Sequence, residues 1–397
     1  MAEPIPLLTP ADGLPDVVRS GAALRDLAVS IAAGQGPIAV DAERASGFRY
    51  SARAYLIQLR REGAGSSLID PIPIAGRFAP LAEALAGPEW VLHAASQDLP
   101  CLAELGLHPT RLFDTELAGR LAGLPRVGLG PMVEQLLGLR LEKGHGAADW
   151  SNRPLPEDWL VYAALDVEVL IELRDVLDDL LTRQGKRDWA AQEFVAVRTA
   201  PPPPPRTDPW RRTSGIHRVR RPRQLAAVRE LWRARDELAE QRDIAPGRVL
   251  PDSAIVEASV TAPTSADDLS KLPVFRGRAQ RRLASYWWSA LNRAATLPNA
   301  ELPPTTLTSD GPPPVSRWAD RDPEAAARLA AARAAIAEIG KRYELPVENL
   351  LQPDLLRRVC WQPPPSVEEA LRAGGARDWQ VELTAAPLTQ AVAVTRG

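Results

Sequence analysis

The stretch VYAALDVEVLIE, residues 161–172, carries Tyr162 and Asp166 four positions apart. Apolar residues recur through it and beyond it at three- and four-residue steps: Leu165, Val169, Leu173, Val176 and Leu180. This spacing predicts one long amphipathic helix. Positions i and i+4 share a helix face, so the phenol and the carboxylate point to the same side. Such a pair is more often a packed ring beside a solvated acid, so a site requires further carboxylates nearby.

Two more acids follow a short apolar run near the N-terminus. In PIAVDAERAS, residues 38–40 are typical of a buried strand, and Asp41 and Glu43 come directly after them. Alternate residues of a strand share a face, so both carboxylates project the same way and Ala42 points away. Repulsion between them is costly unless a cation intervenes. The alternative is a pair of solvated acids on a loop.

A fifth polar group, Asp98, lies in ASQDLPCLAEL, which predicts a helix with Ser96 as its N-cap. Asp98 would then stand in the first turn, where compensation of the helix dipole is the alternative to a functional role. His93 closes the preceding apolar strand, and we expect it to be structural. Asp114 precedes another helix, and helix capping explains it adequately.

The remaining pattern of the first half is that of an α/β domain. Two apolar runs, Ala54–Arg60 and Ser66–Asp70, are separated by the turn-forming EGAG and predict an antiparallel meander with the first strand. Further expected elements are helices near residues 24–33, 78–86 and 130–137 and a strand at 90–93.

A polar loop, LEKGHGAADWSNRPLPEDW, leads into the helix of Tyr162. Its Lys143, Trp150 and Arg153 could hold a phosphate or stack a base beside the acids. The alternative is that Trp150 anchors the loop to the core and Arg153 pairs with a nearby acid.

Two proline-rich breaks divide the rest of the chain. TAPPPPPRTDP predicts a semi-rigid spacer, and LPPTTLTSDGPPP separates two purely helical blocks. ARDELAEQRDIAPGRVLPDSAI in the first block lines up with ARAAIAEIGKRYELPVENLLQPDLL in the second, which indicates two copies of one small helical module.

Charge is unevenly distributed although the formal net charge is only −2. Residues 206–298 carry about eight more Arg and Lys than Asp and Glu. We expect a phosphate-contacting surface at the start of the first block, formed by Arg218, Arg220, Arg221 and Arg223. Ordinary solvated helix faces are the alternative.

Cysteine usage and hydropathy limit the compartment. The two cysteines, Cys101 and Cys360, lie far apart without a CxxC pattern, which argues against zinc and against a disulfide framework. The N-terminus has no basic region followed by an apolar core, and no apolar run reaches about 18 residues. We therefore expect a soluble cytoplasmic protein.

Oxygen ligands without cysteine, and with few histidines, suit hard cations such as Mg²⁺ or Mn²⁺. Two such ions about 4 Å apart form the clamp that phosphodiester hydrolysis uses. In that scheme one ion activates the attacking water, the other neutralises the leaving 3′ oxygen, and Tyr162 orients the water or helps to deprotonate it.

VDAE, HAASQDL and DWSNRPLPEDWLVYAALDVEVL resemble the three exonuclease motifs of ribonuclease D, in the tyrosine subgroup of the DEDD 3′-to-5′ exonucleases. The resemblance covers roughly residues 20–185. It implies that Asp41, Glu43, Asp98 and Asp166 hold two divalent cations and that Tyr162 is catalytic. It also implies an RNase H-like α/β fold with a mixed sheet.

The two helical blocks resemble HRDC domains, the second more distantly. The expected organisation is an exonuclease domain at 1–199, a linker at 200–213, an HRDC domain at 214–298, a linker at 299–316 and a divergent HRDC-like domain at 317–397. The family implies trimming of RNA 3′ ends, tRNA precursors being its usual substrate, with release of nucleoside 5′-monophosphates.

Two other functions fit the same motifs. DNA exonucleases share them, although no polymerase follows here and no GxxxxGK[ST] motif of a helicase is present. A nucleic-acid-binding protein with an inactive nuclease fold is the other alternative, but such proteins usually lose one or more acids, and all four are present.

Overall fold

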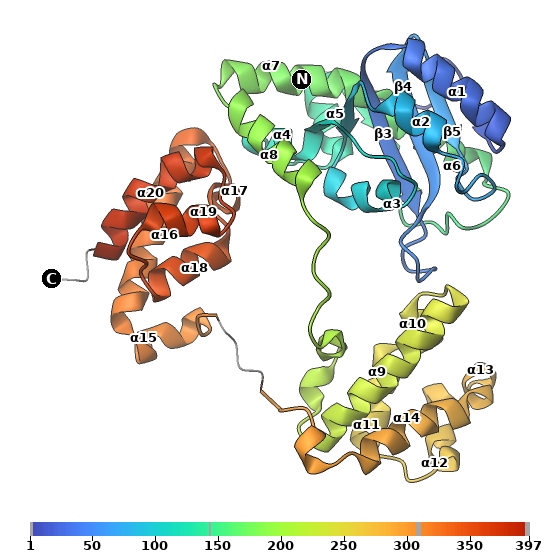
Figure 1. Cartoon of the computed structure of the whole chain (residues 1–397), viewed down its shortest axis with the longest axis vertical. Helices are drawn as coiled ribbons and strands as arrows, with labels where there is room; N and C mark the ends of the chain where they lie inside the picture. The colour runs from blue at the N-terminus through green and yellow to red at the C-terminus, as the bar shows by residue number, and fades with distance from the viewer. Residues whose placement is uncertain (1–2, 143, 307–310, 394–397) are drawn as a thin grey trace.

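The computed structural model of the chain describes residues 3–142, 144–306 and 311–393. It confirms the expected architecture, in which an α/β domain, the one expected to be the exonuclease domain, is followed by two all-helical modules (Figure 1). Within the described residues, we find no helix with the length and apolar character needed to cross a membrane.

One six-stranded sheet, ordered β2-β5-β4-β3-β6-β7, organises the first domain. The central strand β3 (Gln35–Arg44) runs antiparallel to β4 (Ala54–Glu62), and β4 runs antiparallel to β5 (Gly65–Ile69), which confirms the predicted meander. The outer pairings are parallel and involve β2 (Val17–Val18), β6 (Glu89–Leu92) and β7 (Arg111–Asp114). Two short strands, β1 (Ile5–Leu7) and β8 (Leu139–Leu141), pair separately.

Helices cover the sheet on both faces. Ile57 and Leu59 of β4 join the main apolar core, whereas Leu56 packs in a smaller core with Ala163 and Ala164 of α6. The alternation along β4 therefore separates two buried layers. The helices of this domain are α1 (Gly21–Ala33), α2 (Ala79–Leu85), α3 (Leu99–Ala103), α4 (Thr115–Leu121), α5 (Leu129–Leu137), α6 (Glu157–Glu168), α7 (Leu170–Arg183) and α8 (Arg187–Thr199).

The expected single long helix around Asp166 is wrong, because the chain forms α6 and α7 with a break at Val169. Apolar spacing reports which side of a segment is buried, not whether its backbone hydrogen bonds continue. Here α6 packs Ala164 in the small core, while α7 buries Leu173 in the large one. Helix α8 is a further difference, because no helix was predicted after Gln184.

The predicted internal repeat is confirmed by the order of the helices. The first module has α9 (Pro222–Arg242), α10 (Pro246–Val249), α11 (Asp252–Thr261), α12 (Ala266–Lys271), α13 (Arg278–Arg282) and α14 (Ala284–Thr296). The second has α15 (Trp318–Arg321), α16 (Pro323–Tyr343), α17 (Val347–Leu350), α18 (Pro353–Trp361), α19 (Val367–Ala373) and α20 (Asp378–Ala393).

The two modules share a distinctive corner. In each, a 21-residue helix starts at a proline, ends before a residue in the left-handed conformation, and leads into a four-residue helix. The left-handed residues are Asp243 (φ 48°) and Glu344 (φ 52°).

The first module is longer than expected at both ends. Trp210, placed in the linker by sequence, is only 2% exposed and belongs to the core of this module. At the other end, Arg223 binds the side chain of Asn299 at 2.9 Å, so the chain beyond residue 298 also folds onto the module. The proline content of the sequence predicted a spacer, but it could not show that the last residues of this spacer pack against the core of the first module.

The first module touches the exonuclease domain chiefly through polar groups, and Tyr50 of that domain also packs against the core of the module. Asp243 accepts a hydrogen bond from the backbone N–H of Ser51 at 2.9 Å and pairs with Arg53 at 3.1 Å. Arg248 donates to the Gly47 carbonyl at 2.7 Å and lies over the Phe48 ring.

The C-terminal module instead shares the main apolar core of the exonuclease domain. Trp379 stacks on Trp189 of α8 with ring centroids 5.0 Å apart and donates its indole N–H to Glu193. Arg377 pairs with the same glutamate at 3.2 Å. This module is therefore built into the first domain.

Candidate active site

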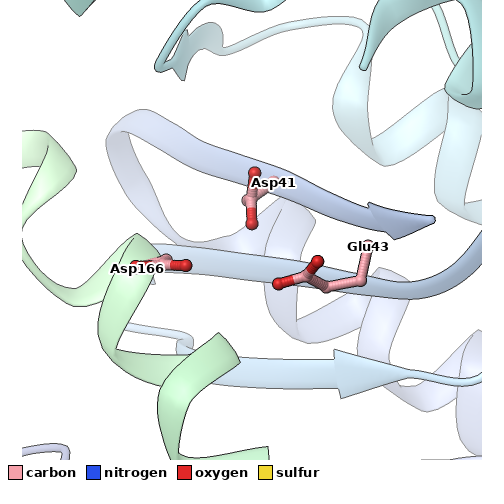
Figure 2. A group of neighbouring side chains, drawn as sticks. All are labelled: Asp41, Glu43 and Asp166. Atoms are coloured by element: carbon pink, nitrogen blue, oxygen red, sulfur yellow. The ribbon is translucent and has the colours of Figure 1, made fainter. Parts of the chain in front are cut away.

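Three carboxylates from two elements meet beside the central strand. Oxygens of Asp41 and Glu43 on β3 and of Asp166 on α6 all lie within 4.8 Å of one another. Figure 2 shows the three side chains directed toward one another between the strand and the helix. Asp41 and Glu43 share a face of β3, as their alternate positions predicted.

Asp98 lies at the edge of this group rather than in it. Its carboxylate is 5% exposed and faces the same cavity, but it pairs with Arg44 at 3.5 Å. The charges of Asp98, Asp41 and Glu43 act on one another, so Asp98 lies near the other acids but outside the group whose oxygens all lie within 4.8 Å.

The local fold around Asp98 also differs from the expected one. Ser96 lies within a short 3₁₀ turn, Ala95–Gln97, and does not cap a helix. Asp98 stands directly before α3, and its side chain makes no capping hydrogen bond. Its carboxylate is therefore available to the cavity, so helix capping does not explain it.

Asp114 caps a helix, as predicted, and His93 lines the cavity of the acids. Asp114 caps α4 and also accepts the backbone N–H groups of Ala94 and Ala95, which fixes the turn that leads to Asp98. His93 contacts Thr115 at 2.9 Å, and burial lowers the pKa of its imidazole to about 4. The imidazole is therefore neutral at pH 7.

Tyr162 lies one helical turn before Asp166 on α6, close enough that, after burial, the carboxylate charge raises the pKa of the phenol, which confirms the predicted shared face. The edge of its ring meets His145 at 5.7 Å between centroids. Burial, and after it the charges of Asp166 and Glu43, raise the pKa of the Tyr162 phenol well above its ordinary value. The hydroxyl therefore remains protonated at neutral pH.

Proximity and burial shift the titration of all four acids upward. Burial raises the pKa of Asp41 to about 6, and burial together with Asp41 raises that of Asp98 to about 8. Burial, then the charges of Asp41 and Asp166, raise the pKa of Glu43 to about 9. The pKa of Asp166 is also well above its usual range, again chiefly because of burial.

These residues fit hard divalent cations. The donor set consists of carboxylate oxygens, which Mg²⁺ and Mn²⁺ prefer. Carboxylates this close and this buried repel one another unless a positive charge lies among them. A bound cation would favour the ionised forms and bring the pKa values back down.

The acids line a cavity of about 780 Å³ that also takes side chains from α4 and α5. Its rim carries Arg126 and Glu134 beside the polar groups already described. Arg44 and Arg126 are cationic groups that the sequence interpretation overlooked. Arg44 directly follows Glu43 in the sequence, and this adjacency was the signal that could have placed a cation beside the acids. The pairing of β3 with β4 is irregular between these two residues, which changes the direction of the strand there.

The structure corrects two predicted substrate contacts on the loop before α6. Trp150 is fully buried, donates its indole N–H to the His145 carbonyl and packs against Trp159, so it cannot stack a base. Arg153 binds both oxygens of buried Asp70 at 2.7 and 2.9 Å. Both residues therefore have the structural roles that were the alternative. Lys143 lies outside the described residues.

The arginines expected to contact phosphate divide into two kinds. The guanidinium of Arg223 is bound within the module, because it donates hydrogen bonds to the Ala294 and Leu297 carbonyls at the end of α14. The prediction that Arg223 contacts phosphate is therefore wrong. The other three are exposed: Arg218, Arg220 and Arg221. They stand at the start of α9, whose opposite end contacts the exonuclease domain; at 1.5 Å per residue, roughly 30 Å separates the two ends.

Family models match three parts of the chain. A model of 3′-5′ exonuclease domains matches residues 15–182, and a model of the HRDC domain matches residues 224–291. A separate model, of the C-terminal domain of 3′ to 5′ exonucleases, matches residues 311–392, so the second helical block has a family description of its own.

Known proteins resemble the chain in sequence and in structure. A ribonuclease D of Jannaschia sp. is 31% identical over 68% of this chain and 72% of its own length. A solved structure of a protein from Bifidobacterium adolescentis has a TM-score of 0.93 at 40% identity, covering 98% of this chain and all of the other. The structure of Escherichia coli RNase D, described as an exoribonuclease involved in structured RNA processing, has a TM-score of 0.69 at 26% identity and covers 95% and 98% of the two chains.

Other curated relatives match about three fifths of the chain. Three further curated relatives, also ribonucleases D, are 33 to 34% identical to the chain. The chain spans 61 to 64% of their length, which is less than two thirds.

Proposed function

This chain belongs to the ribonuclease D family, and we propose that it hydrolyses RNA from the 3′ end with the help of divalent metal ions. The observation that carries this proposal is the meeting of Asp41, Glu43 and Asp166 oxygens within 4.8 Å in a cavity. The products would be nucleoside 5′-monophosphates.

Asp41, Glu43 and Asp166 would hold the cations, either Mg²⁺ or Mn²⁺, and Asp98 at the edge of the same cavity would serve a second ion. When bound, two such cations supply the charge that activates a water for attack on phosphorus and stabilises the leaving 3′ oxygen. The buried walls around the acids exclude bulk water and strengthen every electrostatic interaction there.

Tyr162 would position the attacking water and would not act as a base. Its raised pKa keeps the hydroxyl protonated, and the contact of its ring with His145 fixes the direction of the phenol. A lone pair of the phenol oxygen can accept a hydrogen bond from water. Of the two roles considered from sequence, orientation is the one that the local charges favour.

The first helical module would hold the body of the RNA. Arg218, Arg220 and Arg221 are exposed at the end of α9 that is far from the exonuclease domain. Contacts there would involve phosphates well away from the 3′ end, which suits a folded substrate such as a tRNA precursor. Short single strands would not reach them.

The test is 3′ trimming of matched RNA and DNA oligomers in Mg²⁺ by the full chain and by Asp41→Asn and Asp166→Asn. We expect rapid release of 5′-monophosphates from RNA and nearly complete loss of activity in both variants, because each removes a ligand charge while keeping the side-chain shape. Exposed Glu172, changed to Gln, is the matched control. Normal turnover by either aspartate variant would overturn the metal assignment, and a clear preference for DNA would overturn the substrate.

A further inference from the structure

Gln58 is a fully buried polar side chain without a partner. It lies in the middle of β4 with no exposed surface, and neither its amide nitrogen nor its amide oxygen has a hydrogen-bond partner among the described residues. Buried side-chain amides are nearly always satisfied, so such a group calls for a physical explanation. A buried amide left without a partner is costly, because it has lost its hydrogen bonds to water and gained none.

The register of the sheet places Gln58 directly opposite Asp41. Opposite residues of an antiparallel pair project from the same face, with Cβ atoms about 5 Å apart. Glu43 is opposite Leu56 on that face, so Gln58 belongs to the row of side chains that meets the acids.

Helix α6 covers the same row. Leu56 packs with Ala163 and Ala164, and Arg60, two residues beyond Gln58, pairs with Glu168 at 3.1 Å. Gln58 stands between these two contacts on the strand. Its amide is therefore enclosed between Asp41 on the neighbouring strand and the helix that carries Asp166.

We infer that Gln58 is a positioning residue of the metal site, whose amide N–H₂ donates a hydrogen bond to the Asp41 carboxylate when that carboxylate binds a cation. This inference rests on the proposed function. Carboxylates that hold metal ions are themselves held by hydrogen bonds, and loss of such a partner typically weakens metal binding 10- to 100-fold. The amide is neutral, so it can fix the direction of the ligand without competing with the cation for its charge.

The competing explanation is that Gln58 merely fills space between the sheet and α6. Methionine has a similar length and no amide, so Gln58→Met separates the two explanations. If the amide only fills space, the substitution removes an unsatisfied polar group and leaves metal binding unchanged. If the amide positions Asp41, the fold is kept and metal affinity falls.

The experiment is a calorimetric titration of the full chain with Mn²⁺, together with thermal unfolding of the metal-free protein. For Gln58→Met we expect an unfolding midpoint equal to or above that of the wild type, Mn²⁺ affinity about 10- to 100-fold weaker, and recovery of activity at raised Mn²⁺. Gln184→Met is the control, because Gln184 also has a buried unpaired amide oxygen but lies at the end of α7. It should leave Mn²⁺ affinity unchanged.

Each result is decisive. Wild-type Mn²⁺ affinity in Gln58→Met would overturn the inference. A variant that fails to fold would also overturn it, because the amide would then stabilise the metal-free protein. The proposed function is tested separately by the wild type and Asp41→Asn: if the wild type binds no Mn²⁺, or Asp41→Asn binds it equally well, the metal site itself is refuted.

Discussion

The two helical modules have the same opening layout, yet they join the exonuclease domain in opposite ways. Asp243 of the first module and Glu344 of the second occupy the same left-handed corner, and both face the exonuclease domain. The Asp243 contact consists of one partly exposed ion pair, with Arg53, and of hydrogen bonds. Around Glu344 the interface continues into a shared apolar core through stacked Trp379 and Trp189.

The difference has a physical consequence for stability. Burial of apolar surface supplies most of the free energy that holds domains together, whereas exposed ion pairs contribute little. We therefore expect the C-terminal module to unfold together with the exonuclease domain. The first module, which has a core of its own, should unfold as a separate unit.

The largest effect should come from Trp379→Ala. The indole is 1% exposed, and its removal should lower the free energy of unfolding of the exonuclease transition by about 3–5 kcal/mol, as for other buried aromatic residues. Differential scanning calorimetry measures this change. Trp287→Ala is the matched control, because Trp287 is equally buried but belongs to the core of the first module. An unaltered exonuclease transition in Trp379→Ala would show that the C-terminal module stands alone.

The second largest effect should come from binding of Mn²⁺, which should stabilise one unfolding transition and not the other. Mn²⁺ at about 100 times its dissociation constant should add about 2.7 kcal/mol to the unit that contains the acids. We expect the transition shared by the exonuclease domain and the C-terminal module to move upward, while the transition affected by Trp287→Ala stays in place. Equal shifts of both transitions would mean that the first module is also coupled to the core.

Raising the pH of the metal-free protein should lower the stability of the exonuclease domain, whereas metal binding raises it. Burial keeps Glu43 and Asp98 protonated in the folded metal-free protein, with pKa values of about 9 and 8, whereas the unfolded chain ionises near pH 4. Their stabilising contribution is thus fully present below pH 4 and is lost as the pH rises through the folded values. Between pH 7 and 8, a rise in pH lowers the free energy of unfolding by up to about 1.4 kcal/mol per pH unit for each acid that is protonated in the folded protein and ionised in the unfolded chain.

Calorimetry of the metal-free protein at several pH values measures this slope. Glu43→Gln removes one of the titrating groups and should make the slope shallower. The transition of the first module should be flat over the same range. A rise in exonuclease stability with pH, in the absence of metal, would contradict the upward direction of these pKa shifts.

The smallest effect belongs to the polar attachment of the first module. Asp243→Asn keeps a residue that tolerates the left-handed conformation but removes the charge that faces Arg53. We expect a loss of less than about 1 kcal/mol and a contact that loosens as salt is raised. Small-angle scattering at several salt concentrations measures the separation between the first module and the exonuclease domain. If wild type and variant respond alike, the ion pair does not hold the module.

The sequence was most informative where chemistry and local geometry coincide. Alternation on a strand placed Asp41 and Glu43 on one face, and the i, i+4 spacing placed Tyr162 above Asp166; the structure has both. These relations depend only on the backbone period within one element. The internal repeat was also visible, because helix length and the proline that follows it are local features.

Relations between distant residues could not be predicted in the same way. Trp150 looked like an exposed ring because its neighbours are polar, yet it is fully buried under the loop. Arg153 and Arg223 looked like free cations, but Asp70 and the carbonyls at the end of α14 take up their guanidinium groups. The different attachment of the two modules was equally hidden, since it depends on where Trp379 meets Trp189.

The ion pair between Arg44 and Asp98 gives the acidic pocket a positive charge that belongs to the chain itself. A protein stripped by a chelator therefore keeps a cation, the Arg44 guanidinium, among its acidic groups. We expect such a preparation to remain folded and to regain its activity on addition of Mg²⁺. The guanidinium competes with an added cation for Asp98, so Arg44→Gln should lower the Mg²⁺ concentration needed for reactivation.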